Sequence, residues 1–161
     1  MFHIKYLPTM PSTWAFAESW NNAIDGLIRE NQHDVPDESG KPPLWFAANY
    51  GYSECVRKLC EAGVDIDRQD RLGRTALFQA SAAGNVEVVE ILLSHGADPN
   101  IWSENGLSPI YQAIMNRHKG VVELLLSRNP MIPLTVLSSI WRAAAQLMVD
   151  LLSKHGITPK R

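Results

Sequence analysis

The sequence predicts an all-α solenoid of about five stacked helix–turn–helix units, joined by protruding, hairpin-like loops. Three kinds of marker recur with the same period of 33 residues: a loop glycine, an apolar stripe and a residue type that ends helices. These markers are Gly40, Gly73 and Gly106; Val56, Val89 and Val122; and Gly63, Gly96 and Asn129. A repeat of this size cannot bury its apolar face alone, so its neighbours must stack on it.

Each unit is expected to contain two helices separated by a tight turn. Pro43 and Pro109 suit the first turn of the first helix, where a missing N–H has no partner to lose. Gly51 and Gly84 separate this helix from the second one, whose apolar residues follow the helical period. The segments after each second helix are polar and rich in turn residues, which predicts protruding loops.

Two segments and a pair of loop aspartates are similar to the ankyrin-repeat family. The segments are 74–78 (Arg-Thr-Ala-Leu-Phe) and 96–100 (Gly-Ala-Asp-Pro-Asn), and the aspartates are Asp37 and Asp70. The close resemblance covers residues 36–132, with weaker versions on both sides. It implies a stack whose loop tips and first helices form a concave surface on which partner proteins dock.

The position that is usually histidine in this family holds an aromatic residue in each unit: Trp45, Phe78 and Tyr111. The family's histidine generally ties neighbouring loops together, so another interaction must do so here. A column of stacked aromatic rings would serve. Three independent core aromatics are the alternative.

Both ends of the chain are expected to be capping units with a polar outer face. In the N-terminal cap, whose helix is expected to end at Asn31, the inward residues are Trp14, Ala17, Ile24, Leu27 and Ile28, and the outward ones are Glu18, Asn21, Asn22, Asp25 and Arg29. In the final helix, Leu147, Met148, Leu151 and Leu152 face inward, and Arg142, Gln146, Asp150 and Lys154 face outward. The expected single domain, 1–161, therefore consists of an N-terminal cap (8–35), three repeats (36–68, 69–101 and 102–132) and a C-terminal cap with a truncated loop (133–157).

Neither catalysis nor metal or cofactor binding is predicted. The five histidines include no pair at the i, i+4 spacing of a helical zinc site. Cys55 and Cys60 fall on apolar positions of a second helix, where a thiol is usually part of the core. Phosphate loops and nucleophile elbows are absent from the sequence. An enzyme with an unrecognised histidine or cysteine site stays open as an alternative.

Composition and charge argue for a soluble globular protein and against nucleic acid or a membrane surface as its partner. A net charge of −2 gives no electrostatic reason to expect nucleic acid or an anionic membrane surface. The apolar runs are too short for a membrane span. Two cysteines without a CxxC pair indicate a reducing compartment. We therefore expect a cytoplasmic location, with export that needs no cleavable signal left open.

The resemblance places candidate partner-binding residues at the loop tips and along the first helices. At the tips they are Glu38, Lys41, Arg71, Leu72, Arg74, Trp102, Glu104 and Leu107; on the helices they are Asn49, Tyr50, Met115 and Asn116. Trp102 is the sharpest single signal, because exposed tryptophan is typical of interface hot spots. The alternative is that Trp102 folds over the neighbouring loop as a lid.

The loops also alternate in charge. The first loop is acidic, and the second is basic on balance through Arg68, Arg71 and Arg74. A solvated surface explains this pattern. If the pattern is functional, it predicts a partner with an acidic patch that faces the middle loop.

The predicted function is protein–protein interaction by a chain that is a monomer when free. It would act as a stoichiometric inhibitor or immunity-type protein, or as an adaptor; the small, self-capped architecture favours the inhibitor slightly. A different possibility is that the chain is itself a substrate. Asn100 resembles the asparagine that some ankyrin-repeat proteins offer to hydroxylases.

Overall fold

The computed structural model describes residues 14–128, 130 and 146–157. Within these ranges the chain forms eight helices and no strand. The helices are α1 (Trp14–Arg29), α2 (Pro43–Tyr50), α3 (Ser53–Glu61), α4 (Ala76–Ala83), α5 (Val86–Ser94), α6 (Pro109–Met115), α7 (Lys119–Leu126) and α9 (Gln146–Lys154). The predicted all-α class is confirmed.

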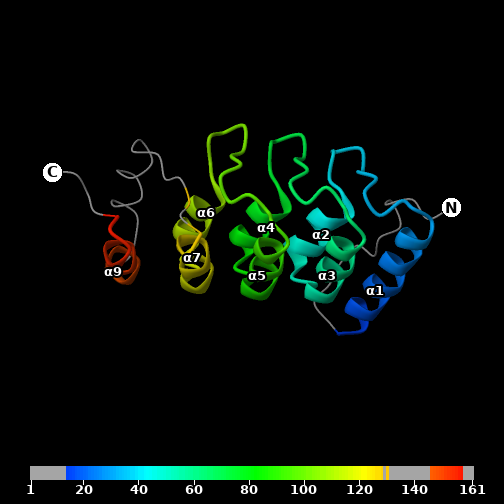
Figure 1. The fold of residues 1–161 in the computed structure, drawn as a ribbon, viewed down its shortest axis with the longest axis horizontal. Helices are drawn as coiled ribbons and strands as arrows, with labels where there is room; N and C mark the ends of the chain where they lie inside the picture. The colour runs from blue at the N-terminus through cyan, green and yellow to red at the C-terminus, as the bar shows by residue number, and fades with distance from the viewer. Residues whose placement is uncertain (1–13, 129, 131–145, 158–161) are drawn as a thin grey trace.

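The helices lie in two rows (Figure 1). In the first row, called the inner row here, α2 packs on α4 and α4 packs on α6. In the outer row, α1, α3, α5 and α7 pack in succession, and each inner helix also packs on the outer helix that follows it. The loops that precede α2, α4 and α6 project from the same side of the stack (Figure 1). This arrangement is the predicted repeat solenoid.

The inner helices begin at residues that suit a helix start. The hydroxyl groups of Thr75 and Ser108 each accept a hydrogen bond from the backbone N–H three residues later, at 3.1 and 3.3 Å. These bonds satisfy donors that the first turn of a helix leaves unpaired. In the first unit the equivalent Pro42 makes no such bond. Pro43 and Pro109 occupy the first turns of α2 and α6, as predicted.

The inner helices end in a left-handed residue or just before one. Gly51 and Gly84 have φ of 76° and 78°, and the third equivalent position holds Arg117 with φ 62°. Glycine is required at the first two positions because the next unit presses on them. A Cβ on Gly51 would lie 2.9 Å from the Asn85 side chain, and one on Gly84 would lie 2.5 Å from the His118 ring.

Asn85 and His118 also connect each unit to the one before it. The Asn85 amide donates to the Ala48 carbonyl oxygen at 2.9 Å. The His118 Nε2 atom lies 3.1 Å from the Ala82 carbonyl oxygen, to which the Asn116 amide also donates at 2.7 Å. Because the last carbonyl groups of a helix have no partner within it, these side chains complete the inner helices of the preceding units.

The N-terminal end of the stack is held by apolar residues of α1. Ile24 and Leu27 are buried and Ile28 packs against the core, as predicted. Trp20, only 2% exposed, is a further anchor that the sequence interpretation missed. Asn31 has φ 56° two residues after Arg29, the last residue of this helix, so it lies at the helix end as predicted.

The outward face predicted for α1 is partly wrong. Asn22 and Arg29 are exposed. Asn21 instead accepts a hydrogen bond from the Cys55 thiol at 3.1 Å, and Asp25 binds the Lys58 ammonium group at 2.8 Å. The reason is that α1 packs on α3, so these two polar residues lie at a helix–helix contact. The side chains of Trp14, Ala17 and Glu18 lie outside the described residues.

The expected column of aromatic rings does not form. Trp45 and Phe78 are buried and Tyr111 is half-buried, but no ring contact joins any two of them among the described residues. Equivalent side chains on neighbouring inner helices point the same way, so they are separated by the full helix spacing of about 8–10 Å. Stacked rings need centroids within about 7 Å. These residues are separate members of the core, which was the alternative.

At the C-terminal end, Leu151 and Leu152 of α9 are buried, whereas Asp150 and Lys154 are exposed, as predicted. The other predictions for this end fall outside the described residues: Asn129, the truncated loop, Arg142 and the side chains of Gln146, Leu147 and Met148. In the described part of the chain, no helix has the length and apolar character that crossing a bilayer requires.

Candidate partner-binding surface

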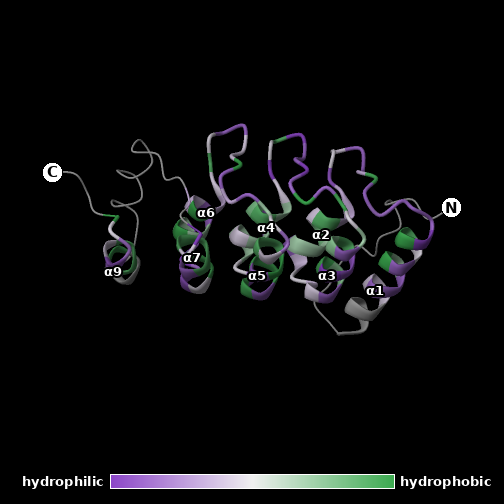
Figure 2. Cartoon of the chain, in the orientation of Figure 1, coloured by the Kyte–Doolittle hydropathy of each residue, from purple (hydrophilic) through white to green (hydrophobic). Residues whose placement is uncertain are grey.

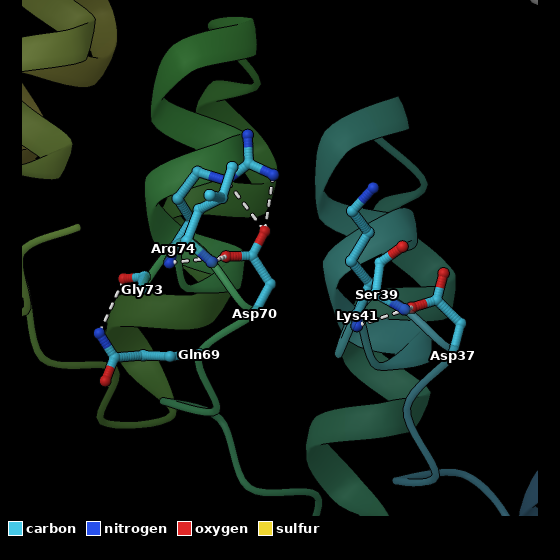
Figure 3. Close-up of polar contacts among 8 residues, drawn as sticks. Asp37, Ser39, Lys41, Gln69, Asp70, Gly73 and Arg74 are labelled. Carbon is cyan, nitrogen blue, oxygen red and sulfur yellow. Dashed lines mark hydrogen bonds and ion pairs between the residues drawn. The ribbon is translucent and has the colours of Figure 1, made fainter. Parts of the chain in front are cut away.

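Each loop is folded around an acceptor side chain, which Figure 3 shows for the first two loops. Asp37 Oδ1 accepts hydrogen bonds from the backbone N–H groups two and four residues later, at 2.8 and 2.9 Å. Asp70 Oδ1 does the same at 2.9 Å in both cases. In the third loop the acceptor is the Ser103 hydroxyl, which takes the Leu107 N–H at 3.3 Å. Each loop therefore has a fixed turn at its tip.

Adjacent loops are hydrogen-bonded to each other. The Arg71 N–H donates to the Ser39 carbonyl oxygen at 3.3 Å, and the Glu104 N–H donates to the Leu72 carbonyl oxygen at 3.0 Å. Gly73 lies at the second contact, where an added Cβ would come within 2.8 Å of the Glu104 nitrogen. The loop tips thus form one continuous edge with a fixed spacing.

Beside this edge lies the uncharged inner row. The sequences of α2, α4 and α6 contain no acidic or basic residue. Figure 2 shows α2 and α4 largely in hydrophobic colours next to mostly hydrophilic loops. Near the ends of these helices Tyr50 and Met115 are each 38% exposed, Ala83 and Asn116 are exposed, and Asn49 is half-buried. A neutral, partly apolar surface therefore adjoins the charged loop tips.

A family model of ankyrin repeats in three copies matches residues 13–103 and again residues 44–136. The two matches together include every helix from α1 to α7. The chain belongs to the ankyrin-repeat family. Ankyrin repeats are generally modules for protein–protein interaction. No curated protein matches the chain.

In this ankyrin stack, four predicted tip residues are exposed. They are Glu38, Arg71, Leu72 and Glu104. Leu72 is 47% exposed, which is unusual for a leucine that has a packed unit on either side. Arg71 and Leu72 lie beside each other at the centre of the loop edge, so that a cation and an apolar group are presented together.

Arg74, another predicted tip residue, is occupied within the protein. Its guanidinium group donates to Asp70 Oδ2 from Nε at 2.9 Å and from Nη2 at 2.7 Å, and the Asp70 side chain is 1% exposed. The same guanidinium lies over the Trp45 ring of the preceding unit, 5.4 Å from its centroid. Burial raises the pKa of Asp70, but hydrogen bonds from Arg74 and from the Leu72 N–H outweigh it and hold this pKa below its ordinary value.

The middle loop is therefore less basic than the sequence suggests. Arg68 lies 3.5 Å from the Asp34 carboxylate and donates to the Asp34 carbonyl oxygen at 3.1 Å. Arg74 is neutralised by Asp70. Of the three arginines that predicted a basic loop, Arg71 alone makes no ion pair within the described residues.

Trp102 was predicted to bind a partner as an exposed residue of the loop tip, but it is not exposed. It is half-buried, and its indole Nε1 is fully buried and has no hydrogen-bond partner within the described residues. Its carbonyl oxygen accepts from the Gln69 amide of the neighbouring loop at 3.3 Å. This placement agrees with the lid alternative. Lys41 and Leu107 are also half-buried, and the Lys41 ammonium group lies 4.7 Å from the Trp45 ring centroid.

Tyr50 belongs to an aromatic cluster at the N-terminal end of the inner row. Its ring lies 6.2 Å from Trp20 and 6.0 Å from Tyr52, and Trp20 also contacts Phe46 at 6.4 Å. These contacts hold the tyrosine ring in place while leaving it 38% exposed. A rigid, partly exposed aromatic ring is suited to act as an interface anchor.

The two thiols, His95 and His118 are arranged as structural groups. Burial raises the pKa of Cys55 to about 12 and that of Cys60 to about 11, so the reactive thiolate is scarce at neutral pH. His95 Nδ1 lies 2.9 Å from the Ile91 carbonyl oxygen at the end of α5, and His118 faces the preceding unit. Within the described residues, no group of three or more His, Cys, Asp or Glu side chains is placed to hold a metal ion.

Asn100 lies in the segment that follows α5 and is half-buried. Its backbone N–H donates to Asp98 Oδ1 at 2.8 Å. Its role as a hydroxylase substrate stays a prediction.

One exposed residue of this surface was missed by the sequence interpretation. Arg117 follows α6 at the repeat position of Gly51 and Gly84, and it keeps their left-handed backbone. The signal was present in the sequence, because the period of 33 residues places Arg117 directly at that turn.

Proposed function

We propose that this chain binds another protein through its loop edge and inner row and carries out no chemistry of its own. The observation that supports the proposal is the exposure of Leu72, Tyr50 and Met115 along one surface whose helices carry no charge. Large apolar side chains exposed on a rigid surface are typical of interaction sites. The binding would be stoichiometric, with the chain a monomer when free and acting as an inhibitor, as an immunity-type protein or as an adaptor in the cytoplasm.

The test is affinity capture from the native cell with the wild-type chain beside Leu72→Glu and Met115→Glu. Glu90→Lys serves as a control, because Glu90 is an exposed residue of the outer helix α5. We expect the partner to be retained by the wild type and the control and to be lost with the two surface variants. A partner that all four proteins retain equally would show that the wrong face has been chosen.

The captured partner also separates the two roles. Loss of an enzymatic activity of the partner in the complex would support an inhibitor. A ternary complex, in which a second protein binds while the first stays bound, would support an adaptor.

A further inference from the structure

The cations of the central units are almost all engaged. Eight lysine and arginine residues occur between positions 41 and 119, and the structure describes this whole segment. Six of them contact a carboxylate or an aromatic ring: Lys41 on Trp45, Arg57 on Glu54, Lys58 on Asp25, Arg68 on Asp34, Arg74 on Asp70 and Lys119 on Glu123. The other two, Arg71 and Arg117, are exposed and make no ion pair or ring contact within the described residues.

Arg117 is also held in a backbone conformation that its side chain disfavours. Its φ of 62° lies in the left-handed region, which glycine occupies at both equivalent turns. An arginine here costs stability relative to glycine, and strained residues that persist on a surface tend to mark functional positions. No hydrogen bond, ion pair or ring contact of the Arg117 side chain within the described residues offsets the strain.

The two arginines lie at opposite edges of the inner row. Arg71 lies four residues before Thr75, the residue that caps the start of α4. Arg117 directly follows Asn116, the residue that caps the end of α6. An inner helix of this length spans ~12 Å and its neighbour lies ~9 Å away, so the two side chains are on the order of 15 Å apart or more. The uncharged surface with Tyr50 and Met115 lies in the same row.

We propose that Arg71 and Arg117 are two charge anchors of one docking surface, whose occupant is a segment of a partner protein with an apolar face and a carboxylate near each end. This inference rests on the proposed function and specifies its partner. An apolar face suits the neutral inner row. The two carboxylates complement the two cations of positions 41–119 that make no ion pair or ring contact within the described residues. A separation of ~15 Å corresponds to about ten residues of helix.

The experiment uses the full chain and a displayed library of random peptides about 16 residues long, enough for a helix of ~24 Å. We expect the enriched peptides to share an apolar stripe flanked by two acidic residues. Each peptide should bind Arg71→Glu and Arg117→Glu roughly tenfold more weakly than the wild type, with a loss that shrinks at high salt. Arg57→Glu is the matched control, because Arg57 is a 45% exposed arginine on the outer helix α3, and it should bind like the wild type.

Arg117→Gly guards against a folding artefact. It removes the charge and relieves the backbone at once, so weaker binding by this variant cannot result from unfolding. We expect it to bind several-fold more weakly than the wild type, although it is at least as stable.

Other outcomes overturn the inference in distinguishable ways. If the enriched peptides lose affinity for Tyr50→Ala and Met115→Ala but not for the arginine variants, the proposed function stands and the charge anchors are wrong. If no peptide is enriched, or if all variants bind alike, both proposals are wrong. If sedimentation shows self-association that Arg117→Glu abolishes, the occupant is a second copy of the chain, and the proposed partner segment is wrong.

Discussion

Replacing Arg117 by glycine is expected to stabilise the folded chain by about 0.5–1 kcal/mol. A non-glycine residue in the left-handed region costs about 1–2 kcal/mol. Replacement by glycine removes this cost but destabilises the folded chain by about 0.5–1 kcal/mol, because glycine increases the entropy of the unfolded chain. The Arg117 side chain is exposed and makes no ion pair within the described residues, so its removal takes little else away. Urea unfolding measures the difference, and a rise in Tm of about 1–4 °C should accompany it.

Two glycines provide the matched controls for this variant. Gly63 has φ 81° and nothing within 4 Å of an added Cβ, so Gly63→Ala measures the backbone cost alone, about 1 kcal/mol of destabilisation. Gly84→Ala adds a clash with His118 and should cost more. The reasoning is refuted if Arg117→Gly is neutral or destabilising while Gly63→Ala shows its expected cost.

Four further predictions concern the loops, the thiols and the joints between units. Asp70→Ala should cost about 2–4 kcal/mol in urea unfolding, because it leaves the partly buried Arg74 guanidinium unpaired, whereas Asp37→Ala, which removes only two backbone hydrogen bonds, should cost about 1 kcal/mol. The pKa of Asp70 is lower in the folded than in the unfolded chain, so its contribution to the free energy of unfolding is complete above about pH 4 and is lost as the pH falls through the folded pKa. The stability of the wild type should therefore decrease in acid more steeply than that of Asp70→Asn. Native Cys55 and Cys60 should react with a thiol reagent much more slowly than in urea, with Cys55 the slower; equal rates in both states would contradict their raised pKa values. Asn85→Ala should cost about 1–2 kcal/mol, since two carbonyl groups at the end of α2 lose their donor.

The architecture could be predicted because its determinants are local and periodic. Glycine at 51 and 84 and proline at 43 and 109 act on the backbone of their own turn, so their spacing alone indicated where helices begin and end. The same reasoning would have found Arg117, which the sequence interpretation missed, because its position predicts a left-handed backbone even though its residue type does not.

The details of the surface depended on contacts between units, which spacing does not show. Charges counted along the middle loop suggested a basic patch, but Arg68 and Arg74 are paired with carboxylates close in space. Trp102 occupies the expected loop, yet its indole nitrogen is buried and its carbonyl oxygen accepts a hydrogen bond from Gln69 of the neighbouring loop. From the next unit, Arg74 rather than the equivalent ring of Phe78 covers Trp45, because a long side chain can span the distance between units and a ring cannot.

Within the described residues, the main helix–helix contacts all join neighbours in the stack, so the length of this molecule is not set by its core. A duplicated copy of residues 69–101 would place a second Asn85 over the first Gly84, as Asn85 now covers Gly51, and a second Arg74 over Phe78, as Arg74 now covers Trp45. Such an insertion would be accommodated without redesign of any neighbouring segment. Gene duplication can therefore lengthen the chain one module at a time, and each added module widens the area available for contact.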